Sequence, residues 1–290
     1  MIISASRRTD IPACRADWFM DRIRAGFCDV ASPFDRSRVS RVSLAPGDVD
    51  VIVFWTRDPS PLMGFLDELD RLGYRYYFQY TLLDYPRALE PGAPNPETVI
   101  SGFRRLADRI GAAKVVWRYD PILIAPALGP DFHRERFERL AAALAGATER
   151  VVISLYDEYP FTRARLRRLE AAGLSPIEPS LEAAGALIRF LAAAAEAKGM
   201  TMVSCAEKLD LRPFGVRPGR CIDPVLIQKL FGIEVPRRKD PGQRPLCGCA
   251  PSRDIGAYDT CGRGCLYCYA TRTRIGPSGS PPGGRPAISP

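Results

Sequence analysis

Histidine is almost absent from this sequence: His133 is the only one in 290 residues. Catalytic zinc sites commonly use two or three imidazoles, so we do not expect His-based metal catalysis. His133 falls early in a charged helical segment, which predicts a surface position.

Several sequence motifs with a defined chemistry are also missing. There is no G-x-G-x-x-G or P-loop pattern, and no G-x-S-x-G elbow. Hydride transfer, phosphoryl transfer and serine hydrolysis therefore lack their usual motifs. The most apolar helical segment, residues 187–197, is too short for a membrane span, and no charged leader precedes an apolar run. We expect a cytoplasmic protein without membrane contact, whose 46% hydrophobic residues can bury a core.

Cysteine, in contrast, is plentiful, with nine residues. In a reducing compartment, metal binding outranks disulfides. Cys261, Cys265 and Cys268 form a C-x3-C-x2-C motif, with Tyr267 before the third cysteine. Three thiolates at this spacing can hold three irons of a [4Fe–4S] cluster and leave the fourth iron open. Zinc with a fourth cysteine, and disulfides or free thiols, are the alternatives.

A second group of cysteines lies in or beside the C-terminal third: Cys205, Cys221, Cys247 and Cys249. They predict a second metal site, holding either an auxiliary [4Fe–4S] cluster or zinc. Cys14 and Cys28 stand apart, and we interpret them as buried small hydrophobic residues.

The rest of the pattern is an alternation of strands and helices. Predicted strands are Ile2–Ala5, Val49–Trp55, Tyr74–Thr81, Lys114–Arg118, Arg150–Leu155 and Met200–Cys205. Predicted helices are Ala16–Ala25, Pro61–Leu72, Pro96–Ile110, Asp131–Leu144, Thr162–Ala172, Leu181–Lys198 and, later, Pro224–Leu230. This order predicts an α/β protein with a parallel sheet, which we interpret as a TIM-like βα barrel, full or partial. Residues 1–210 would form the barrel, residues 211–275 a cysteine-rich segment closing its mouth, and residues 276–290 a disordered tail.

Polar residues follow every predicted strand, although the strands themselves are apolar. In a βα barrel these positions share one face, where functional groups collect. Asp10 and Asp58 are also plausible helix caps. The polar set comprises Arg7, Arg8, Asp10, Gln79, Arg118, Asp120, Ser154 and Glu207.

The cysteine motif resembles the cluster loop of radical S-adenosylmethionine (radical SAM) enzymes. That resemblance implies a [4Fe–4S] cluster whose open iron chelates S-adenosylmethionine, reductive formation of a 5′-deoxyadenosyl radical, and a reductant such as flavodoxin or ferredoxin. In most such enzymes the loop follows the first barrel strand, whereas here it ends the chain. If residues 254–260 form a strand beside Ile2–Ala5, the barrel is circularly permuted.

The C-terminal position of the motif is similar to that in the bacterial family called domain of unknown function 1848. Ser6–Pro12, Val53–Thr56, Trp117–Pro121 and Asp254–Cys261 carry this likeness, which names no substrate.

The resemblance to radical SAM enzymes suggests how the polar residues after the strands would bind S-adenosylmethionine. Arg7, Arg8 or Arg118 would pair with the carboxylate of S-adenosylmethionine, and Asp120, Gln79 or Glu207 would accept from its ribose. Trp55, Tyr80 or Trp117 would stack on adenine, with core packing as the alternative. We therefore expect catalytic roles for Arg8, Asp10, Arg118, Asp120 and Glu207, and cofactor contacts from Arg7, Gln79, Tyr80, Trp117, Ser154 and Tyr267. The Gly-Gly-Glu run that many radical SAM enzymes carry is absent.

A different class of function is also open. The formal net charge is +8, which suits nucleic acid or a phosphorylated substrate. A nucleic-acid-binding or repair-type protein could use an iron–sulfur or zinc centre as a staple without radical chemistry. Most of the arginines are dispersed along helices and read as solvated faces.

Overall fold

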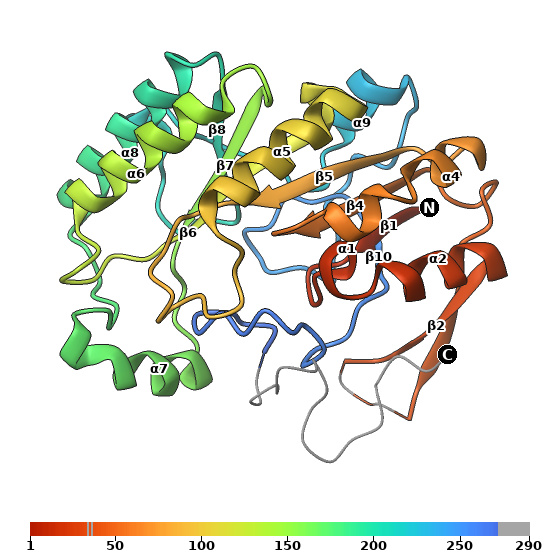
Figure 1. The fold of residues 1–290 in the computed structure, drawn as a ribbon, viewed down its shortest axis with the longest axis horizontal. Coiled ribbons are helices and arrows are strands. Elements are labelled where there is room, and N and C mark those ends of the chain that lie inside the picture. The colour runs from red at the N-terminus through yellow and green to blue at the C-terminus, as the bar shows by residue number, and fades with distance from the viewer. Residues whose placement is uncertain (34, 36, 272–290) are drawn as a thin grey trace.

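A single parallel sheet of eight strands organises the molecule, a computed structural model that describes residues 1–33, 35 and 37–271. The strand order is β10-β1-β4-β5-β6-β7-β8-β9, and every neighbouring pair is parallel (Figure 1). The predicted α/β class and parallel sheet are thus confirmed. The strands are β1 (Ile2–Ala5), β4 (Val51–Thr56), β5 (Tyr76–Thr81), β6 (Val115–Ile122), β7 (Arg150–Leu155), β8 (Thr201–Ser204), β9 (Arg217–Pro218) and β10 (Arg253–Asp254).

Helices follow most strands, as the alternation predicts. They are α1 (Ile11–Cys14), α2 (Ala16–Ala25), α3 (Ser60–Met63), α4 (Leu66–Arg71), α5 (Pro96–Ile110), α6 (Pro130–Leu144), α7 (Pro160–Leu166), α8 (Leu181–Glu196) and α9 (Pro224–Phe231). Asn95 caps α5 by accepting a hydrogen bond from the Glu97 N–H, with Pro96 in the first turn, which is a favourable helix start. None of the helices in the described part of the chain is long and apolar enough to cross a membrane.

Three local predictions need correction. The single helix expected over Pro61–Leu72 is two short helices, α3 and α4. The helix expected over Thr162–Ala172 is α7 followed by a 3-10 turn, Arg167–Ala172. An antiparallel ribbon, β2 (Phe27–Ala31) with β3 (Val39–Ser43), was not anticipated, because each strand buries only one residue fully and lacks a continuous apolar run. The tail predicted over residues 276–290 lies outside the described residues.

The two faces of the sheet have different coverings, since alternate side chains of a strand point to opposite sides. One face, here called the outer face, packs against the helices between α2 and α8. Its core is aromatic: the Trp117 ring stacks on Phe137 at 4.8 Å between centroids, and Phe54 stacks on Phe78 at 4.8 Å.

The opposite face, here called the inner face, is covered by the chain that follows β9. Val53, Val116 and Val152 of the sheet form a second core with Ile222 and Leu226, the latter from α9. Residues 211–271 therefore contribute two strands to the sheet and a layer over its inner face.

His133 is buried, contrary to the surface position expected for it, with 0% of its area exposed. Its ring lies between the Tyr119 hydroxyl (2.9 Å from Nδ1) and the Leu123 carbonyl (3.1 Å from Nε2). Burial lowers the pKa of His133 to about 4, so the imidazole is neutral at pH 7. The surface position was predicted from the charged residues beside His133 in the sequence, and these do not indicate which side of the helix packs against the core.

β10 decides where the cysteine motif lies. It pairs in parallel with β1, Ile3 opposite Arg253 and Ser4 opposite Asp254. A Cβ on Gly256 would lie 2.1 Å from the Ser6 Oγ, so only glycine permits this approach. From there the chain runs along the carboxyl ends of the strands toward α7 (Figure 1).

Candidate functional site

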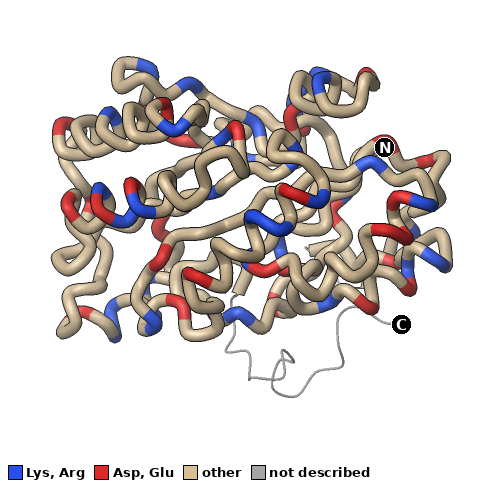
Figure 2. The backbone as a smooth tube through the Cα atoms, turned by 45° about the horizontal axis from the view of Figure 1, so that its top comes forward, with Lys and Arg blue, Asp and Glu red and all other residues tan. Residues whose placement is uncertain are grey.

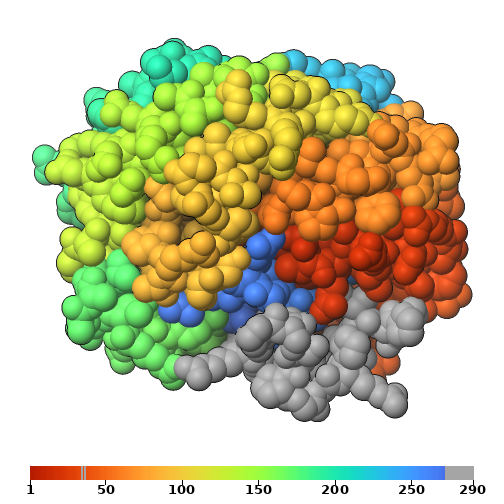
Figure 3. All heavy atoms as spheres, in the orientation of Figure 1, coloured from red at the N-terminus to blue at the C-terminus, as the bar shows by residue number. Residues whose placement is uncertain are grey.

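The cysteine motif lies in a loop that spans the carboxyl edge of the sheet; residues 259–271 are called the cluster loop below. Figure 3 shows the C-terminal segment in blue at the surface, between the loop that follows β5 and the N-terminal residues. Two backbone contacts tie it to the β5–α5 connection. The Leu266 N–H donates to the Leu89 carbonyl at 2.9 Å, and the Gly92 N–H donates to the Arg263 carbonyl at 3.1 Å.

The other end of the cluster loop is fastened to elements on both sides. Arg165 of α7 donates to the Cys268 carbonyl at 2.7 Å, and the Tyr269 hydroxyl donates to the Arg7 carbonyl at 2.8 Å. Because the loops after β1, β5 and β7 all hold it, the cluster loop is positioned by the sheet as a whole.

Tyr267 anchors the middle of the cluster loop. Its hydroxyl receives a hydrogen bond from Arg57 and donates one to Glu90. Arg57 and Glu90 form an ion pair at 2.8 Å, with 13% and 4% of their side chains exposed. The structure thus places Tyr267, expected to contact a cofactor, in a buried polar anchor. Sequence reasoning missed Glu90 because nothing in its proline-rich segment marks it.

The three thiols of the motif are shielded from solvent to different degrees: Cys265 is buried, and Cys261 and Cys268 are half-buried. The Cys268 N–H donates to the Cys265 carbonyl at 3.1 Å, closing a tight turn between the second and third cysteines. Burial raises the pKa of both thiols. A metal would therefore have to displace protons, which makes binding by these thiols dependent on pH.

Cys14, at the end of α1, lies against the Cys261 thiol. The hydrogen bond from Cys261 lowers the pKa of Cys14 to about 7, and the same contact, with burial, raises the pKa of Cys261. The interpretation of Cys14 as an isolated hydrophobic residue was therefore wrong, because a long-range contact brings it to the motif. Cys28 is buried as predicted, with 1% of its area exposed.

Asp10 caps α1, the helix that carries Cys14 beside Cys261. Its carboxylate caps α1 by accepting from the Ala13 N–H and also accepts from the Arg57 N–H at 2.9 Å, so the capping role is confirmed. Burial raises the pKa of Asp10. Arg263 lies 3.8 Å from this carboxylate and 3.1 Å from that of Asp58. Two aspartates that follow different strands are thus joined through the cluster loop.

Four predicted site residues form one hydrogen-bonded chain on the inner face. Arg118 donates to the Gln79 side chain at 3.2 Å and pairs with Asp120. Asp120 in turn accepts from the Ser154 hydroxyl. Glu207 stands apart and accepts from the Leu155 N–H at 2.8 Å.

Arg7 and Arg8 follow β1 beside this chain. The Arg7 guanidinium lies 5.0 Å from the centroid of the Trp55 ring, and its buried Nη2 has no hydrogen-bond partner among the described residues. Arg8 lies 5.2 Å from the centroid of the Tyr258 ring and makes no ion pair with any residue that the structure describes. Both cations therefore retain donor capacity.

Tyr80 and Trp117 are not brought to this edge. Their side chains are 1% and 0% exposed and stack on Phe103 and Phe137 under the outer helices. The Trp117 indole donates to the Leu82 carbonyl at 3.0 Å. Both rings belong to the core of the outer face, which was the alternative to adenine stacking.

The second group of cysteines does converge. The sulfurs of Cys205 and Cys221 are 3.3 Å apart, and the thiol contacts continue from Cys221 to Cys249 and from Cys249 to Cys247. In these conformations the thiols form a chain. No group of three or more Cys, His, Asp or Glu side chains in the described residues surrounds a point where a metal ion could be held.

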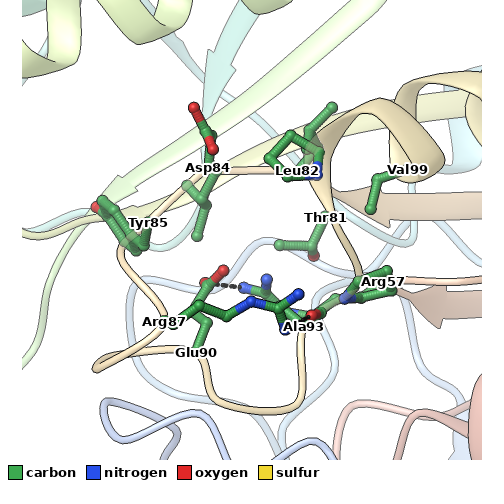
Figure 4. A pocket seen from close by; sticks show the side chains of 12 residues that line it. Arg57, Thr81, Leu82, Asp84, Tyr85, Arg87, Glu90, Ala93 and Val99 are labelled. Atoms are coloured by element: carbon green, nitrogen blue, oxygen red, sulfur yellow. Dashed lines mark hydrogen bonds and ion pairs between the residues drawn. The ribbon is translucent and has the colours of Figure 1, made fainter.

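A cavity of about 150 Å³ opens beside the cluster loop (Figure 4). It is lined by the connection from β5 to α5, including Thr81, Asp84 and Arg87, and by the Arg57–Glu90 pair that anchors Tyr267. In the close-up the Arg57 guanidinium reaches the Glu90 carboxylate, whereas the Arg87 side chain extends toward Ala93, to whose carbonyl it donates. The rest of the lining is largely apolar and includes Leu82, Leu83 and Val99.

Charge is mixed over the surface. Figure 2 shows basic and acidic residues interspersed along the helices, and many are paired, as Arg24 is with Glu68 at 2.7 Å. In the described part of the chain, basic residues are therefore interspersed with acidic ones, whereas a nucleic-acid-binding surface gathers basic residues on one face.

These features define an α/β protein that carries a cysteine loop on the carboxyl edge of a parallel sheet. The profile of the family described as domain of unknown function (DUF1848) matches residues 2–270. The chain belongs to this family. No curated protein matches it.

Proposed function

We propose that this protein is a radical SAM-type enzyme, which binds a [4Fe–4S] cluster through Cys261, Cys265 and Cys268 and cleaves S-adenosylmethionine reductively to act on a substrate. One observation carries the proposal: β10, which leads into the cluster loop, lies at the sheet edge beside β1. The neighbouring strands follow in the order β10, β1, β4, β5, β6 and β7. This order would correspond to a partial barrel in which the first strand, β10, has been moved to the end of the sequence. In the radical SAM enzymes that the motif resembles, the cluster loop follows that first strand.

The donor set fits the cluster. Three thiolates from one short loop are the ligands that iron–sulfur clusters take, and the fastening of the loop to α7 and to the β5–α5 connection would limit the entropy lost on loading. When bound, the cluster would supply the electron that cleaves the sulfonium.

The residues near the loop suit the polar parts of S-adenosylmethionine. Arg8 follows the strand next to β10 and has no carboxylate partner among the described residues, so it is our candidate for the methionine carboxylate. The chain from the buried Gln79 and Arg118 to the half-buried Asp120 and Ser154 provides donors and acceptors for the ribose. Asp10, whose pKa is raised by burial, caps α1 and so positions Cys14 beside Cys261.

The test is anaerobic reconstitution of the full chain with iron and sulfide, followed by reduction in the presence of S-adenosylmethionine. We expect visible charge-transfer absorption and formation of 5′-deoxyadenosine. Cys265→Ala should lose both, whereas Cys28→Ala, which removes a buried thiol far from the loop in sequence, should keep both. Zinc as the only metal bound by the loop, or iron loading without 5′-deoxyadenosine, would refute the proposal.

The position of Cys14 favours a second candidate, a metal-stapled protein without radical chemistry. If Cys14 joins the three loop thiols, four thiolates close the site. Cys14→Ala separates the two functions: radical chemistry requires the variant to keep its iron and its 5′-deoxyadenosine formation, whereas a closed site loses its metal. Nucleic-acid binding that depends on salt and persists without S-adenosylmethionine would support the staple.

A further inference from the structure

Four cysteines from separate parts of the chain meet on the inner face, away from the cluster loop in sequence. Cys205 follows β8, Cys221 follows β9, and Cys247 and Cys249 come after α9. Cys221, Cys247 and Cys249 are 4%, 7% and 2% exposed. Cysteines packed as small hydrophobic residues would explain the burial, so burial by itself does not indicate a ligand.

The guanidinium groups around these thiols point to a negatively charged centre. Arg118 donates to the Cys221 sulfur at 2.8 Å, and the Ile222 N–H donates to the Cys249 sulfur at 3.4 Å. In metal–thiolate sites, hydrogen bonds of this kind to the ligand sulfurs orient the ligands and stabilise their negative charge.

Arg7 is the decisive residue. Its Nη2 is buried and lacks a hydrogen-bond partner among the described residues, and the Cys249 and Cys221 thiols lie near its guanidinium together with the Asp254 carboxylate. The nearby Asp254 carboxylate already accepts from Ser4, from Ser6 and from the main-chain N–H of Arg7. A buried guanidinium N–H without an acceptor is unfavourable, so negative charge on the neighbouring sulfurs would stabilise Arg7 beyond what Asp254 provides.

We propose that Cys205, Cys221, Cys247 and Cys249 bind a single tetrahedral zinc ion as a structural centre separate from the cluster loop. Four thiolates around zinc leave two net negative charges, which Arg7 and Arg118 face. Sulfurs bound at 2.3 Å lie about 3.8 Å apart in a tetrahedron, close to the 3.3 Å between Cys205 and Cys221. An iron–sulfur cube would need a wider spacing.

The thiols are in contact in the order Cys205, Cys221, Cys249 and Cys247. To bind one zinc ion, the side chains of Cys205 and Cys247, at the two ends of this series, must rotate toward a common centre. It would join the ends of β8 and β9 to the segment that leads into β10. The centre would therefore hold the inner layer on the sheet and, through β10, the base of the cluster loop.

Cobalt(II) titration tests the proposal, using the full chain with the loop ligands removed (C261A/C265A/C268A). We expect one cobalt per chain, with sulfur-to-cobalt charge transfer and tetrahedral d–d bands, and displacement by zinc. Adding C221A/C249A should abolish the spectrum, and adding C28A should leave it unchanged. Because the loop ligands are absent throughout, failure of the proposed radical chemistry does not affect the result.

Arg7→Gln provides a variant that keeps every ligand, in case the double cysteine variant does not fold. Its zinc affinity should fall by about 10- to 100-fold, and Arg7→Lys should retain more of it. No cobalt spectrum in the loop variant, the same spectrum after removal of Cys221 and Cys249, or four irons bound by this group in place of zinc would overturn the proposal.

Discussion

The contact between Gly92 and Arg263 can be tested by adding one methyl group. A Cβ on Gly92 would lie 2.4 Å from the Arg263 carbonyl oxygen, 2.9 Å from its carbon and 3.0 Å from its Cα. These are backbone atoms, which cannot rotate away as a side chain can. Ordinary contact begins at 3.4 Å, so the cluster loop would have to move by about 1 Å in Gly92→Ala.

That shift would break a defined set of interactions. The Gly92 N–H donates to the Arg263 carbonyl at 3.1 Å, and the Arg263 side chain donates to the Gly92 carbonyl at 3.1 Å. Net hydrogen-bond contributions of about 1 kcal/mol each imply that the closed loop loses about 2 kcal/mol relative to open conformations. Its opening equilibrium should therefore rise about 30-fold.

Hydrogen exchange measured by mass spectrometry would detect the change in peptides covering residues 259–271. The Leu266 amide, bonded to Leu89 at 2.9 Å, should exchange faster in Gly92→Ala, and iron retention after anaerobic reconstitution should fall. Gly64→Ala is the matched control, since its added Cβ has no atom within 4 Å. Wild-type exchange and iron retention in Gly92→Ala would refute the reasoning.

Three further predictions concern the buried polar groups and the core. His133 has a folded pKa of about 4, below its usual 6.5, so the unfolded state binds more protons between these values. The free energy of unfolding should fall by about 2 kcal/mol from pH 7 to pH 4.5 through this residue alone. Denaturant titrations at several pH values should show that the unfolding free energy of His133→Gln depends less on pH than that of the wild type, and an equal dependence on pH would contradict the assignment. Glu90→Gln should cost about 3 kcal/mol because it leaves Arg57 buried without its partner, against less than about 0.5 kcal/mol for the exposed Asp21→Asn; equal melting temperatures would exclude an anchoring role. Trp117→Phe should leave S-adenosylmethionine binding unchanged in calorimetry while lowering the free energy of unfolding by about 1–2 kcal/mol; a large loss of binding would return Trp117 to the site.

Predictions from local pattern succeeded where neighbouring residues carry the information. The bounds of α2, α5 and β7 are those expected from apolar runs and helix caps. The failures lie where local signals are weak, as at the break between α3 and α4, or where packing overrides the charge of the neighbours, as at His133. The clustering of Cys205, Cys221, Cys247 and Cys249 in the C-terminal third of the sequence predicted that they come together. The order in which their thiols contact one another could not be predicted.

The sequence by itself determined the α/β class, the parallel sheet and the spacing of the three loop cysteines. These depend on periodicity, on capping residues and on ligand positions within about ten residues of one another. Only the tertiary structure placed Cys14 against Cys261, Glu90 against Tyr267, and β10 beside β1. Each of these contacts joins segments at least 170 residues apart, and their pairing depends on how the whole sheet is assembled.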